Sequence, residues 1–96
     1  MTDLAEEYGK GLYDLTEEGH VSVDVLSQLR VLKGLFRDQP DFIRLLCNMS
    51  LAKEERTSIL DGALRGQVHP YVLNFLKILC ERGALHEFEG CVSAFT

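Results

Sequence analysis

The chain has 96 residues, of which 46% are hydrophobic and 26% are charged. A chain of this length has room for one domain around a single core, and this mixture of residues excludes a disordered chain. Fifteen acidic residues against ten basic ones give a formal net charge of -5, which argues against nucleic acid or an anionic lipid surface as the partner.

No segment of the sequence is long and apolar enough for a membrane helix. The longest stretch without a charged residue, residues 66–76, has 11 residues, whereas a bilayer span needs about 20. The acidic start of the chain is unlike a secretory signal peptide, so we expect a cytoplasmic protein.

Cys47, Cys80 and Cys91 are widely and unequally spaced, which predicts small apolar residues on helix faces rather than disulfides or zinc ligands.

The first predicted helix ends before Gly19 and carries one apolar stripe, formed by Leu4, Tyr8, Leu12 and Leu15. Gly9 and Gly11 interrupt this helix, and each costs about 0.5–1 kcal/mol relative to alanine. Small residues allow another helix to approach closely. The two glycines therefore indicate either tight packing within the domain or contact with an external partner helix.

Five more helices are predicted from their boundary residues. The second begins with Ser22 as its N-cap, the third begins at Pro40, the fourth runs from Lys53 to a stop at Gly66, the fifth begins at His69-Pro70 and stops at Gly83, and the sixth covers residues 84–96. The expected core stripes are Val25, Leu29, Leu32 and Phe36 in the second helix; Phe42, Leu45, Leu46 and Met49 in the third; Ile59, Leu60, Ala63 and Leu64 in the fourth; and Leu85, Phe88, Val92 and Phe95 in the sixth. Gly34 and Gly62 are interpreted as close-packing positions. Because the connections are short, the fold class predicted is all-α, a six-helix bundle in a single domain.

The fifth helix is more hydrophobic than one buried face requires. Val72, Phe75, Leu76 and Leu79 fill one face, while Tyr71 and Ile78 lie along a second. Such a helix is either wrapped on all sides by the bundle or leaves its second face for a partner helix.

Five segments in order resemble the δ subunit of bacterial F-type ATP synthases, known in mitochondria as the oligomycin-sensitivity-conferring protein (OSCP). They are Tyr8-Gly-Lys-Gly-Leu-Tyr13, Pro40-Asp-Phe-x-x-Leu-Leu46, Lys53-Glu-Glu55, Leu73-Asn-Phe-Leu-Lys-Ile-Leu79 and Glu81-Arg-Gly-Ala-Leu85. Each segment alone is a weak helical pattern, but the five together cover essentially the whole chain in the family's order and spacing.

The resemblance implies a non-catalytic stator component that helps to link the catalytic head to the peripheral stalk during proton-driven ATP synthesis. In the family, a six-helix N-terminal domain binds the N-terminal helix of an α subunit between its first and fifth helices. Carried over by position, the partner-binding residues are Tyr8, Gly11, Leu12, Tyr71, Asn74, Phe75 and Ile78. Asn74 is expected to be a polar anchor in an apolar strip.

The resemblance also implies a location and a missing part. The protein is expected at the cytoplasmic face of the bacterial plasma membrane, held there through the ATP synthase complex without inserting into the membrane. The family's second, C-terminal domain contacts the peripheral stalk, and residues 1–96 are expected to lack it. Three departures from the family pattern stand out: glycines at 9 and 11 in place of alanine, Ala84 in place of arginine, and Ala52 in place of a capping serine. We therefore expect Ser50 to cap the fourth helix.

The sequence favours binding over catalysis, with no cofactor. His20, His69 and His86 fall near helix ends, and no histidine or cysteine lies within three or four residues of another, so no catalytic or metal site is expected. One alternative is a helical adaptor that binds another amphipathic helix. A weaker one is a helix-turn-helix nucleic-acid binder, which would have to present Lys77 and Arg82 among apolar side chains.

Overall fold

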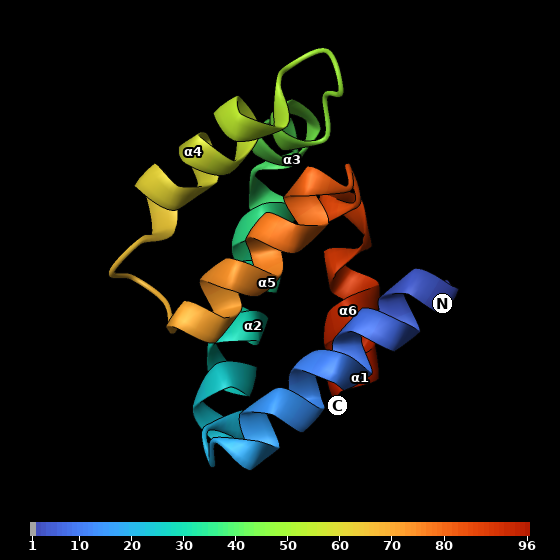
Figure 1. The fold of residues 1–96 in the computed structure, drawn as a ribbon, viewed down its shortest axis with the longest axis vertical. Coiled ribbons are helices and arrows are strands. Elements are labelled where there is room, and N and C mark those ends of the chain that lie inside the picture. The colour runs from blue at the N-terminus through green and yellow to red at the C-terminus, as the bar shows by residue number, and fades with distance from the viewer. Residues whose placement is uncertain (1) are drawn as a thin grey trace.

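The computed structural model describes residues 2–96, and within them it contains six α-helices and no strand. The helices are α1 (Asp3–Glu18), α2 (Ser22–Asp38), α3 (Pro40–Leu46), α4 (Lys53–Leu64), α5 (Pro70–Glu81) and α6 (Phe88–Phe95), with a 3₁₀ turn at Leu85–Glu87 before α6. The all-α, six-helix prediction is confirmed. The first and last helices, α1 and α6, lie side by side, and α4 and α5 pack together as a second pair (Figure 1).

The core is built around α5. Six of its twelve residues are buried, namely Val72, Leu73, Phe75, Leu76, Leu79 and Cys80. The predicted core stripes of the second and sixth helices are buried in full, and the Phe36 and Phe88 rings meet edge to face with centroids 5.2 Å apart. Cys91 is buried as well, and burial raises the pKa of its thiol to about 11, which fits an apolar packing role.

Several predicted core positions are exposed instead. In the third segment Leu45 is exposed, and Met49 lies beyond the end of α3 with 65% of its surface exposed. In α4 only Leu60 and Leu64 of the predicted stripe are buried. This short helix lies at the edge of the bundle and packs mainly against α5 (Figure 1), and only a few of its residues are buried.

The predicted helix starts and stops are only partly correct. Ser22 is the first residue of α2 rather than its N-cap, which is Val21, and Val21 makes no side-chain capping bond. Ser50 does not cap α4 either, because the N-cap is Ala52. Ser50 is instead held in the preceding turn, where its amide donates to the Asn48 side chain at 3.0 Å. Gly66 and Gly83 adopt positive φ after α4 and α5, as expected for helix stops.

A buried arginine ties α3, α4 and α5 together. Arg56 of α4 is only 2% exposed, and its guanidinium donates to the carbonyl oxygens of Leu46, Leu51 and Cys80. Leu46 and Cys80 lie at the C-terminal ends of α3 and α5, where carbonyl groups lack helical partners and a positive charge is favourable. The charge is therefore neutralised by helix ends rather than by a carboxylate.

Candidate functional site: an apolar groove between α1 and α5

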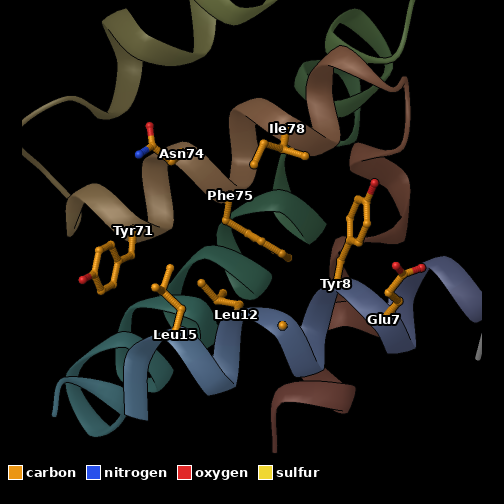
Figure 2. Close-up of a pocket in the computed structure, with 9 residues that line it drawn as sticks. Glu7, Tyr8, Leu12, Leu15, Tyr71, Asn74, Phe75 and Ile78 are labelled. Atoms are coloured by element: carbon orange, nitrogen blue, oxygen red, sulfur yellow. The ribbon is translucent and has the colours of Figure 1, made fainter. Parts of the chain in front are cut away.

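A groove of about 540 Å³ runs between α1 and α5. Nine residues line it: Glu7, Tyr8, Gly11, Leu12, Leu15, Tyr71, Asn74, Phe75 and Ile78. All seven residues expected from the sequence to bind a partner are among them, so the structure brings the predicted set together in one place (Figure 2). The groove is therefore the candidate binding site of the domain.

The choice of residues that α1 buries in the bundle explains why its larger apolar side chains line the groove. The residues of α1 that are buried in the bundle are mostly small: Ala5, Gly9, Leu12 and Thr16. They form a narrow stripe that lets α6 approach closely. The stripe predicted as core is rotated toward α5, so that Tyr8 is only partly buried and Leu15 is 43% exposed. Only Leu12 belongs to both stripes.

The two glycines of α1 serve different surfaces. A Cβ atom on Gly9 would lie 2.4 Å from the Cys91 carbonyl oxygen and 2.7 Å from the Ala94 Cβ atom, so this glycine is needed for packing against α6. A Cβ atom on Gly11 would meet nothing within 4 Å, and Gly11 lines the groove. Of the two interpretations left open by the sequence, internal packing applies to Gly9, whereas Gly11 leaves space in the groove. Gly34 and Gly62 also have open space around them, so their interpretation as packing positions was wrong.

The floor of the groove is buried and its upper walls are exposed. Leu12 and Phe75 form the floor and are 5% and 8% exposed. Above them Leu15 and Ile78 expose 43% and 49% of their surfaces, on opposite walls (Figure 2). The second face of α5 is therefore left uncovered in the isolated chain. Covering such exposed apolar side chains gives a favourable free energy of about 25 cal/mol per Å².

A tyrosine at each end of the groove is held by its neighbours. The Arg82 guanidinium lies over the Tyr8 ring, 5.6 Å from its centroid, which is a cation–π arrangement. At the other end the Tyr71 and His69 rings have centroids 4.7 Å apart, and a Cβ on Gly19 would lie 3.4 Å from Tyr71 Cε2. His69 also caps α5, because its Nδ1 accepts a hydrogen bond from the Tyr71 amide at 3.0 Å. Both aromatic rings are thus positioned before any partner arrives.

The polar residues of the groove lie on its rim. Asn74 is exposed, and its amide group points away from α1 in Figure 2. Within residues 2–96 its side chain makes no hydrogen bond, so the amide is available to a ligand. Lys77 is turned away from the groove and pairs with Asp61 of α4. Arg65 and Lys77 both donate hydrogen bonds to Asp61, and together they hold the pKa of that carboxyl well below its usual range.

The groove holds no set of residues arranged for acid–base or nucleophilic chemistry. Across residues 2–96, no three His, Cys, Asp or Glu side chains gather so that they could hold a metal ion. One thiol–imidazole pair occurs outside the groove, with Cys47 Sγ 3.8 Å from His86 Nδ1. The largely apolar lining of the groove suits the recognition of an apolar surface.

Two groove residues, Glu7 and Leu15, were missed by the partner-binding prediction. Leu15 belongs to the apolar stripe already recognised in the first helix and lies seven residues after Tyr8, on the same face. Glu7 lies four residues before Gly11 and so shares its edge of the helix. Helical spacing from the predicted residues would therefore have found both.

No helix within residues 2–96 combines the length and the apolar character that crossing a membrane requires.

Comparison with known proteins identifies a family. Residues 4–96 match the family described as ATP synthase delta (OSCP) subunit. Among similar curated proteins, ATP synthase subunit delta of Lachnoclostridium phytofermentans is 27% identical over 96% of this chain and 50% of its own length, and that of Synechococcus sp. is 28% identical over 99% and 52%. The chloroplastic ATP synthase subunit delta of Galdieria sulphuraria is 24% identical over 96% of this chain and 52% of its own length. The chain thus spans about half the length of the curated relatives it matches. No solved structure matches it significantly.

Proposed function

The chain belongs to the ATP synthase delta (OSCP) subunit family, and from this premise we propose that it is a non-catalytic stator module that binds the N-terminal helix of an α subunit in the α1–α5 groove. The observation that carries the proposal is the groove itself. Seven residues expected from the family resemblance to bind this helix line one partly exposed apolar channel between two helices. An amphipathic helix laid in such a groove places its side chains at positions i, i+3, i+4 and i+7 against the walls.

In this proposal the floor and the walls of the groove contribute to binding in different ways. Leu12 and Phe75 are already buried and give a firm floor, whereas Leu15 and Ile78 lose exposed apolar surface when the partner helix covers them. Tyr8 and Tyr71, held at the two ends, would limit the length of helix that lies deep in the groove. Asn74 would hydrogen-bond to a polar group of the partner at the rim and so fix its register.

The proposed module would help to link the catalytic head to the peripheral stalk, and so support proton-driven ATP synthesis. Residues 1–96 would supply the contact with the head, and contact with peripheral stalk subunits would be made outside them, by a C-terminal domain. The protein would act at the cytoplasmic face of the bacterial plasma membrane, held there through the complex. A role as a DNA recognition helix suits α5 poorly, because half of its residues are buried and Lys77 is paired with Asp61.

The test is calorimetric titration of the chain with a synthetic peptide of the α-subunit N-terminal segment from the same organism. Two variants alter the groove, Ile78→Asp on one wall and Tyr8→Ala on the other. We expect each to weaken binding by about 2 kcal/mol or more, roughly 30-fold, as for a central anchor of an interface. Val31→Asp is the matched control, because Val31 is 68% exposed on α2 and does not line the groove.

The outcomes separate the parts of the proposal. If wild type does not bind the peptide at high micromolar concentration, the assignment of the α subunit as partner is wrong. If wild type binds while Ile78→Asp and Tyr8→Ala bind equally well, the binding surface lies elsewhere. Binding of an unrelated amphipathic helix in place of the α-subunit peptide would favour the adaptor alternative.

A further inference from the structure

The rim of the α1–α5 groove is asymmetric in charge. Residues 7, 11, 14 and 18 are spaced by four, three and four, so they follow one edge of α1. Three of these four positions are acidic: Glu7, Asp14 and Glu18. Glu7 and Gly11 line the groove, which places this edge along its outer wall. We call Glu7, Asp14 and Glu18 the acidic edge.

The acidic edge is exposed and is not neutralised by the rest of the domain. All three side chains belong to exposed residues, and none forms an ion pair within residues 2–96. The nearest base on the same helix, Lys10, is held by Glu6 at 2.8 Å, and this pairing lowers the pKa of Glu6 and raises that of Lys10. These carboxylates are therefore available to a ligand in the groove.

The opposite wall does not balance this charge. Lys77 is engaged by Asp61 on the side of α5 that faces α4. Arg82 lies at one end of the groove, over the Tyr8 ring, and Glu81 beside it is exposed. On the α1 side the groove is thus bordered by Glu7, with Asp14 and Glu18 farther along the same edge of the helix, and on the α5 side it is bordered by the neutral residues Asn74 and Ile78.

From this charge pattern we infer that the helix occupying the groove is an amphipathic helix whose flank toward α1 is basic, with lysine or arginine one and two turns apart. The inference rests on the proposed helix-binding role and adds the chemistry of the partner. A helix with an acidic flank would bring like charges together at two or three points, which disfavours it as a partner. A basic flank would also speed encounter at low ionic strength, because exposed charges act over about one Debye length, roughly 10 Å at 0.1 M salt.

Two synthetic helices with the same apolar stripe test this inference. One carries lysine on the flank next to the stripe, and the other carries glutamate at the same positions. We expect the lysine peptide to bind the wild-type chain at least 10-fold more tightly at 50 mM NaCl, with the preference falling to less than 3-fold at 500 mM NaCl.

A triple variant with neutral side chains along the acidic edge tests whether these residues cause the preference. In the variant E7Q/D14N/E18Q the preference for the lysine peptide should fall below 3-fold even at 50 mM NaCl. The matched control D38N/E54Q/E55Q removes the same number of exposed carboxylates from α2 and α4, away from the groove, and should keep most of the preference. Circular dichroism confirms that both variants are folded.

Equal affinity for the two peptides, tighter binding of the glutamate peptide, or binding of neither would overturn the inference. So would an equal loss of preference in the control variant, because the net charge of the chain alone would then explain the result. The proposed function fails by a separate result, namely no binding of the α-subunit segment. If that segment binds while the lysine and glutamate peptides are not distinguished, the proposed function stands and the inference is wrong.

Discussion

The contact between α1 and α6 makes replacement of Gly9 by alanine a sharp test of the structure. A Cβ atom at position 9 would lie 2.4 Å from the Cys91 carbonyl oxygen and 2.7 Å from the Ala94 Cβ atom. Both are rigidly placed atoms of α6 rather than the ends of flexible side chains. The two helices must therefore separate locally, and overpacking of this kind costs about 1–3 kcal/mol.

The same substitution also has a favourable term. Alanine is a better helix former than glycine by about 1 kcal/mol in a helix interior. We therefore expect Gly9→Ala to lower the free energy of unfolding by a net value of up to about 2 kcal/mol. For a domain of this size the melting temperature would fall by up to about 15 °C.

Gly34→Ala is the matched control, because a Cβ atom at position 34 of α2 meets nothing within 4 Å. The helix-forming term then acts alone, and this variant should gain about 0.5–1 kcal/mol. Urea denaturation followed by circular dichroism measures both variants against wild type. If Gly9→Ala is as stable as Gly34→Ala, α6 does not approach α1 as closely as the structure shows, and the argument that α1 packs on α6 through its small residues is refuted.

Two further predictions concern residues outside the groove. Arg56→Met should lower the free energy of unfolding by about 2–4 kcal/mol, because buried carbonyl groups at the ends of α3 and α5 lose a charged donor. The control Arg44→Met, on the exposed face of α3, should change the free energy of unfolding by less than about 0.5 kcal/mol in the same urea titration. The Arg65 and Lys77 side chains depress the pKa of Asp61 in the folded state. These two contacts therefore stabilise the fold at pH values above the pKa of Asp61 in the unfolded chain, and this stabilisation is lost as the pH falls below about 4. Asp61→Asn should therefore be less stable than wild type at pH 7 but should lose less stability between pH 5 and pH 2, and parallel pH profiles of the two proteins would contradict this assignment.

The buried face of a helix could be predicted from the sequence where its most regular apolar stripe faces the core. The second and sixth helices behave in this way, and their stripes of Val25 to Phe36 and Leu85 to Phe95 are buried as expected. The first helix contacts the core with small residues and leaves its larger apolar residues for the groove. Hydrophobic periodicity gives more weight to Leu4, Tyr8 and Leu15 than to Ala5, Gly9 and Thr16, so the direction of the core could not be read from the first helix alone.

Most of the candidate groove could be predicted because helical spacing and the family resemblance point to the same two helix faces. The capping residues and Arg56 could not. Ser22 is the first residue of α2 and Ser50 lies two residues before the N-cap of α4, and a displacement of one or two residues turns a cap into an ordinary helical position or a turn. Arg56 looks like a surface residue of an amphipathic helix. Its burial depends on the ends of α3 and α5, which lie 10 and 24 residues away along the chain.

The pairing of α1 with α6 has a consequence for how the domain is made. These helices come from opposite ends of the chain, and the Thr2 hydroxyl contacts the Glu87 carboxylate across 85 positions of sequence. Closing so long a loop has an entropic cost that contacts between sequence neighbours do not offset, so α1 is expected to dock late in folding. During synthesis α1 leaves the ribosome first but has its main packing partner only once residues 88–95 have followed. The wall that carries Tyr8 and Leu15 is then set last, and a nascent chain cannot offer a finished groove to a partner before nearly the whole domain has been translated.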